Sequence, residues 1–178
     1  MNTDEKYMSM AVELARRASG MTYPNPMVGA VIVCRDHVIG RGYHHKSGLP
    51  HAEVNAIASV NDKSQLAEST MYVTLEPCSH YGKTPPCADL IISSGIPEVV
   101  IGMQDTFGKV NGRGIDKLRR AGVKVTVGIL EDKCRRLNRR FITYHTCKRP
   151  YIILKWAQSQ DGYLDRLRID ASVPPAAI

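Results

Sequence analysis

Apolar segments of strand length alternate with amphipathic segments of helical length along most of this chain. The run 28–33, VGAVIV, has the length and the uninterrupted apolar character of a buried strand. Segment 4–19 instead has apolar residues at helical spacing, with Thr3 as the expected N-cap and Gly20 just after it. The pattern predicts further strands at 38–43, 70–75, 98–103 and 124–127, and further helices at 51–60, 85–94, 114–121 and 130–145. Such alternation predicts a three-layer α/β/α sandwich, in which helices cover both faces of a mixed sheet.

The length and composition fit one globular domain. The 178 residues are 43% hydrophobic and 23% charged, proportions that are typical of a folded domain and argue against disorder, collagen and coiled coil. The sequence has no run of 18 apolar residues, which argues against a membrane span. The N-terminus, MNTDEK, is polar and lacks the apolar core of a signal peptide, so we expect a cytoplasmic protein.

The net charge of +7 comes from one segment. Residues 117–149 contain 11 basic and 2 acidic side chains, whereas the rest of the chain is close to neutral. A basic strip can bind nucleic acid or phosphate, but a solvated helix face is the simpler interpretation and the one we favour. Within this segment Leu137, Phe141 and Tyr144 form a stripe that we assign to the core or to a subunit interface.

The strongest chemical signal is one histidine and two cysteines in separate segments. His51 stands two residues before Glu53, and Cys78 and Cys87 follow later in the chain. One imidazole and two thiolates provide three zinc ligands and leave a fourth position open for water. His51 and Cys87 fall near predicted helix starts, where partial positive charge favours a thiolate. We therefore predict a Zn²⁺ site with Glu53 as the group that handles the protons of the water.

The remaining cysteines, Cys34, Cys134 and Cys147, have no such partners and are not expected to bind metal. An odd total of five widely spaced cysteines also argues against a disulfide framework. A histidine-x-glutamate pair followed by Pro-Cys and a later cysteine is typical of zinc nucleobase deaminases. The alternative is a non-catalytic structural zinc module, which would have no open position at the metal and no need for Glu53.

Three stretches resemble a known family: 23–29 (YPNPMVG), 50–54 (PHAEV) and 74–87 (TLEPCSHYGKTPPC). They are similar to the deaminase domain of the bifunctional riboflavin-biosynthesis deaminase–reductases, and the resemblance covers roughly residues 4–165. Its most specific feature is the amino-acid sequence of the eight residues between Cys78 and Cys87. The resemblance implies a cytidine-deaminase-like fold, one Zn²⁺ and Glu53 as catalytic acid and base. It implies hydrolysis of the 2-amino group of 2,5-diamino-6-ribosylamino-4(3H)-pyrimidinone 5′-phosphate, with release of ammonia.

The same resemblance implies contacts to this small-molecule ribotide phosphate. Asn25 and His44 match family positions that hold the pyrimidine. Lys83 and His80 match contacts to the ribose phosphate, and Asp105 matches a contact to the ribose. Phe107 departs from the family pattern, in which a polar residue is usual at this place. Phe107 therefore lacks the polar group that would contact the ribose at that position.

By this resemblance, residues 1–149 form the zinc-dependent cytidine-deaminase-like domain. Residues 150–178 then form the opening segment of a truncated reductase domain, and NADPH is expected only in a full-length protein. We expect the apolar segment 152–156 to be a strand docked on the protein, and the protein to be a homo-oligomer.

A nucleic-acid deaminase of the tRNA type and a deaminase of free nucleotides are the alternative functions, since both share the zinc signature. The long gap between Cys78 and Cys87 argues against a nucleic-acid substrate.

Overall fold

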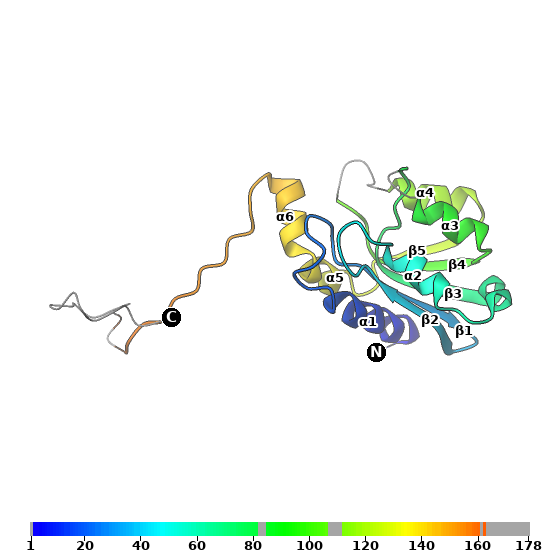
Figure 1. Cartoon of the computed structure of the whole chain (residues 1–178), viewed down its shortest axis with the longest axis horizontal. Coiled ribbons are helices and arrows are strands. Elements are labelled where there is room, and N and C mark those ends of the chain that lie inside the picture. Colours follow the sequence, from blue (N-terminus) through cyan, green and yellow to red (C-terminus); the bar gives the residue numbers. More distant parts are fainter. Residues whose placement is uncertain (1, 82–84, 107–111, 161, 163–178) are drawn as a thin grey trace.

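The computed structural model describes residues 2–81, 85–106, 112–160 and 162, and a five-stranded sheet forms its centre (Figure 1). The strands are β1 (Gly29–Cys34), β2 (His37–Tyr43), β3 (Ser69–Leu75), β4 (Glu98–Met103) and β5 (Lys124–Val127). Their order across the sheet is β2-β1-β3-β4-β5. β1 pairs antiparallel with β2 and β3, whereas β3–β4 and β4–β5 pair in parallel. The predicted mixed sheet is confirmed.

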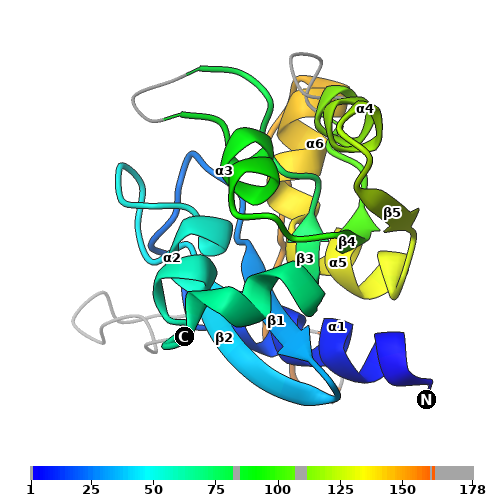
Figure 2. The ribbon, with the colours of Figure 1, turned by 90° about the vertical axis from the view of Figure 1, so that its right-hand side faces the viewer.

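Helices cover both faces of this sheet, which confirms the three-layer architecture (Figure 2). On one face lie α2 (Ala52–Ala58), α3 (Cys87–Ser93) and α4 (Arg113–Arg120), and on the other lie α1 (Thr3–Arg16) and α5 (Glu131–Leu137). Ile32 of β1 belongs to the first core and its neighbour Val31 to the second. Every residue of β1 is buried because successive side chains of a strand enter opposite cores. This explains the unbroken apolar run of the sequence.

Two helices lie so close to the sheet that glycine is required beneath them. A Cβ at Gly29 would collide with the backbone of Ala11 in α1, and one at Gly42 would collide with the backbone of Ala56 in α2. Among the described residues no helix is long and apolar enough to span a bilayer.

Two local predictions are wrong here, and one short element was not predicted. The N-cap of α1 is Asn2, which forms a capping box with Glu5, instead of Thr3. The single helix expected at 130–145 is divided at Asn138 into α5 and α6 (Arg139–Cys147). A short 3₁₀ helix at Lys63–Glu68, which the sequence analysis did not predict, precedes β3.

The segment 152–156 is not a strand, and it is not docked. It leads away from the sheet without regular structure (Figure 1). Leu154 is 78% exposed and Trp156 61% exposed. An apolar sequence pattern alone cannot make a strand, because a strand needs a neighbouring strand to satisfy its backbone groups.

Asn138 joins the α5–α6 junction to a loop that is distant in sequence. Its side chain is buried, accepts a hydrogen bond from the Met27 backbone N–H (2.8 Å) and donates one to the Met27 carbonyl (2.9 Å). These two bonds anchor the loop that contains Asn25. They also explain the helix break, since Asn is a poor residue for a helix interior and competes for backbone partners.

Glu76 follows β3 directly and is buried. Its carboxylate accepts hydrogen bonds from the backbone N–H groups of Asp105 (3.1 Å), Gly112 (2.9 Å), Gly114 (2.8 Å) and Ile115 (3.4 Å). Three of these donors lie at the N-terminus of α4, where the helix dipole also favours negative charge. One side chain thus connects the ends of β3 and β4 to α4.

Replacing Asn138 with Ala should lower the free energy of unfolding by about 1–3 kcal/mol, because it leaves the Met27 backbone groups without their partners. Urea denaturation followed by circular dichroism measures this change. Asn61, which is exposed, provides the matched control, and Asn61→Ala should stay within about 0.5 kcal/mol of wild type. An Asn138→Ala protein as stable as the control would contradict the anchoring role.

Replacing Glu76 with Gln should lower the free energy of unfolding by about 2–4 kcal/mol, since an NH₂ group would then face backbone N–H donors. The same denaturation experiment applies. The exposed Glu13, which pairs with Arg16, is the control, because exposed ion pairs contribute about 0–1 kcal/mol. Equal effects of Glu76→Gln and Glu13→Gln would show that the carboxylate is not an anchor.

Candidate active site

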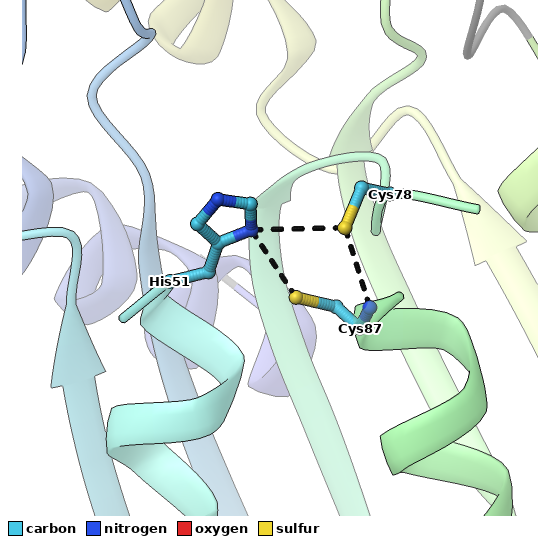
Figure 3. Close-up of side chains that lie close together, drawn as sticks. All are labelled: His51, Cys78 and Cys87. Carbon is cyan, nitrogen blue, oxygen red and sulfur yellow. Dashed lines mark hydrogen bonds between the residues drawn. The ribbon is translucent and has the colours of Figure 1, made fainter. Parts of the chain in front are cut away.

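His51, Cys78 and Cys87 converge at the ends of three different elements (Figure 3). His51 is the N-cap residue of α2, Cys87 is the first residue of α3, and Cys78 lies in the loop after β3. The Nδ1 atom of His51 is 3.6 Å from Sγ of Cys78 and 3.3 Å from Sγ of Cys87. The predicted trio is therefore assembled, with all of its ligand atoms within 4.8 Å of one another.

These distances fit a zinc ion. With Zn–S bonds of about 2.3 Å and a Zn–N bond of about 2.0 Å, tetrahedral coordination separates the ligand atoms by about 3.5–3.8 Å. The two measured separations between the His51 nitrogen and the sulfur atoms are 3.6 and 3.3 Å. Two sulfur ligands and one imidazole nitrogen are also a donor set that zinc prefers.

The surroundings favour metal-binding thiolates. The backbone N–H of Cys87, at the start of α3, donates to Sγ of Cys78 at 3.2 Å. Hydrogen bonds from the Cys87 side chain and from His51 lower the pKa of Cys78 to about 4. The pKa of Cys87 is raised, first by its pairing with Cys78 and then by burial. One thiol of the pair therefore ionises easily, and a cation is needed to hold both as thiolates.

Glu53 lies in the first turn of α2 and lines the same cavity as His51 and Cys78. The side chain is buried, and this burial raises the pKa of its carboxyl group to about 7. A carboxyl group with a pKa near neutral can both accept and release a proton at physiological pH. Glu53 is thus suited to the proton-handling role that its place in the sequence indicated.

A cavity of about 330 Å³ opens beside the trio, at the carboxyl ends of the parallel strands β3 and β4. This end of the strands is the usual ligand-binding edge of an α/β sheet. Four of the predicted substrate contacts line the cavity together with His51, Glu53 and Cys78: Asn25, His44, His80 and Asp105. The fifth, Lys83, lies outside the described residues, as does Phe107.

Asn25 and His44 form a hydrogen-bonded pair on the cavity wall. Nδ1 of the buried His44 lies 3.1 Å from the Pro50 carbonyl oxygen, so it is the donor, and Nε2 accepts from the Asn25 amide at 3.4 Å. Burial lowers the pKa of His44, which favours the neutral ring that this pattern requires. The ring of His44 also meets that of His51 edge-on, with centroids 5.4 Å apart. The contact between His44 and His51 thus places the two predicted pyrimidine-binding residues beside the trio.

The other two predicted contacts differ in setting. Asp105 is buried, and its backbone N–H donates a hydrogen bond to the Glu76 carboxylate. His80 is exposed, in the loop that follows Cys78. Cys34 and Cys134 are buried, Cys147 is exposed, and none of these three joins the trio.

The sequence analysis did not predict several of the cavity residues, among them Glu76 and two side chains of α6. Phe141 and His145 of α6 line the cavity, whereas Tyr144, from the same predicted stripe, is 60% exposed. A continuous helix at 130–145 would have grouped Phe141 with Leu137, but the break at Asn138 changes the direction of the second half. The only sequence signal was Asn138 itself, a poor helix former inside a helical pattern.

Residues 1–103 match the family model "Cytidine and deoxycytidylate deaminase zinc-binding region". The chain is 51% identical over 164 residues to the riboflavin biosynthesis protein RibD of Aquifex aeolicus, covering 92% of this chain and 46% of that protein. It is 46% identical over 159 residues to RibD of Escherichia coli, covering 89% of this chain and 43% of that protein. The chain thus spans less than half the length of these relatives.

A solved structure is similar as well. It is a diaminohydroxyphosphoribosylaminopyrimidine deaminase/5-amino-6-(5-phosphoribosylamino)uracil reductase from Thermotoga maritima, with a TM-score of 0.85 and 47% identity. The match covers 89% of this chain and 45% of that one. The resemblance and the fold class predicted from the sequence are confirmed. With its zinc-ligand trio and its matched residues 1–103, the chain belongs to the cytidine and deoxycytidylate deaminase zinc-binding family.

Proposed function

We propose that this chain catalyses the hydrolytic deamination of 2,5-diamino-6-ribosylamino-4(3H)-pyrimidinone 5′-phosphate, a step of riboflavin biosynthesis. The observation that carries the proposal is one cavity beside the trio, lined by His51, Cys78 and the buried carboxyl group of Glu53. The similarity to RibD proteins supports the choice of substrate. Incubating zinc-loaded protein with this compound, while following ammonia and pyrimidine absorbance, tests the proposal.

The reaction replaces the 2-amino group by a carbonyl. The oxygen of a water molecule adds to C2, the bond from C2 to the amino nitrogen breaks, and ammonia leaves. A zinc ion bound by the trio supplies the Lewis acidity that makes water nucleophilic near neutral pH. Glu53 transfers the two protons of the water in turn: the first goes to the ring nitrogen, and the second, taken from the hydroxyl group on C2 as the carbonyl forms, goes to the departing amine. Its pKa of about 7 suits both transfers.

The remaining cavity residues hold the substrate in this proposal. Asn25 and His44 lie on the cavity wall as the contacts to the pyrimidine, with the Asn25 amide facing its polar edge and the His44 ring holding that amide in place. Asp105 is a ribose contact, and His80 and Lys83 are contacts to the phosphate. These roles come from the family resemblance, and the presence of four of the five side chains in one cavity supports them.

A reductase activity with NADPH is proposed only for a full-length protein. The chain spans 46% of the Aquifex aeolicus relative, and residues 150–178 are proposed as the opening of the reductase part. A cytoplasmic location and a homo-oligomeric state stay predictions.

A nucleic-acid deaminase would use the basic segment 117–149. Three of its basic side chains instead pair with acidic ones: Lys117 with Asp89, Lys124 with Glu98, and Arg135 with Glu131. This pairing reduces the charge that the segment can offer to phosphates. Salt-sensitive retention on a nucleic-acid column would favour the alternative, because phosphate contacts weaken steeply with salt.

Glu53→Gln should retain stoichiometric zinc and lose about 10²–10⁴-fold in turnover, because the variant keeps all three ligands and cannot transfer the proton. Metal analysis and ammonia release from the same preparation provide the two measurements. Near-normal turnover by zinc-replete Glu53→Gln protein would exclude Glu53 as the proton carrier.

Cys87→Ala should lose tightly bound zinc, and turnover with it, because a site with two protein ligands holds the ion weakly. Cys147→Ala is the matched control, since this cysteine is exposed and does not belong to the trio. Zinc content after dialysis separates the two variants. A Cys87→Ala protein with stoichiometric zinc would show that the ligand set is wrong.

A further inference from the structure

Helix α6 contributes a wall to the cavity although it lies outside the segment that matches the family model. The match ends at residue 103, and α6 comprises Arg139–Cys147. Phe141 and His145 of this helix line the cavity with His51 and Glu53. The catalytic candidates and this wall therefore come from separate parts of the chain.

The geometry of α6 explains why these two side chains face the cavity. They are four residues apart on one side of the helix, and their rings lie 4.3 Å apart between centroids. Ile142 packs against the core around α1 and α5, while the two bonds between Asn138 and Met27 fix the start of the helix. The helix is thus held by contacts on its other side.

The trio and α6 approach the cavity from different sides. His51 and Cys87 of the trio lie at the starts of α2 and α3, which cover one face of the sheet. α6 follows α5 on the side of the other face (Figure 1). A ligand with its reacting carbon at the trio therefore extends other groups toward α6.

The chemistry of α6 suits an anionic, sugar-bearing group. Residues 139–149 contain four Lys or Arg side chains and no Asp or Glu. Lys148 is close enough to contribute, after burial, to lowering the pKa of His145. A neutral imidazole can still donate an N–H hydrogen bond, and Phe141 provides an apolar face beside it.

We infer that Phe141 and His145 form a subsite for the ribosyl phosphate end of the substrate, with His145 donating a hydrogen bond to it and Phe141 packing against it. This inference rests on the proposed deaminase function. It makes α6 a specificity element that recognises the sugar phosphate, while the trio and Glu53 act on the pyrimidine.

The test compares two substrates, the ribotide phosphate and the free base 2,5,6-triamino-4-pyrimidinone, which lacks the ribosyl phosphate. For His145→Ala the KM for the ribotide should rise about tenfold or more, because a hydrogen bond to a charged group is lost, with kcat within about twofold. Phe141→Ala should also raise this KM. Neither variant should change kcat/KM for the free base by more than about twofold.

Two further variants serve as controls. Lys133→Ala removes a cationic charge from the neighbouring helix α5 at an exposed position that does not line the cavity, and it should leave the KM for the ribotide within about twofold. His145→Gln keeps an N–H donor and should recover part of the loss. Zinc content and urea denaturation check that each variant is folded.

The outcomes separate the two proposals. If wild-type protein releases ammonia from neither compound, the proposed function fails. If wild-type protein is active but His145→Ala matches it, or loses equally on both substrates, the subsite on α6 is refuted. A loss confined to the ribotide, partly recovered in His145→Gln, supports it.

Discussion

The buried carboxylate of Glu76 organises the edge of the sheet on which the site is built. It accepts backbone N–H groups from the loop after β4 and from the start of α4. Burying a charge is favourable only when hydrogen bonds replace its lost water, and four donors do so here. Because Pro77 and Cys78 follow at once in the chain, the same anchor positions the first cysteine of the trio.

Backbone N–H groups also stabilise the trio. Cys87 begins α3, and its N–H donates to the sulfur of Cys78. His51 occupies the corresponding place at the start of α2. Helix starts leave N–H groups free to stabilise negative charge, so thiolates are favoured where the ligands meet. Glu53 lies in the first turn of α2, where burial raises its pKa toward neutrality.

Asn138 connects this site to the C-terminal part of the chain. By binding both backbone groups of Met27 it fixes the loop that contains Asn25 and sets the direction of α6. One side chain thereby influences two walls of the cavity. The residues proposed for chemistry come from 51–87, whereas the wall facing them depends on a contact between residues 111 positions apart.

The sequence alone determined the order of strands and helices, the layered architecture and the identity of the trio with Glu53. Strand burial shows in apolar runs such as 28–33, and zinc ligands are restricted to a few residue types at recognisable spacings. It did not reveal the cap at Asn2, the break at Asn138 or the exposure of segment 152–156. Asn2 and Thr3 are adjacent residues that both favour caps, and helical periodicity carries no information about a bond to Met27. Only the tertiary structure could decide that Phe141 and His145 face the cavity, because their direction depends on that distant contact.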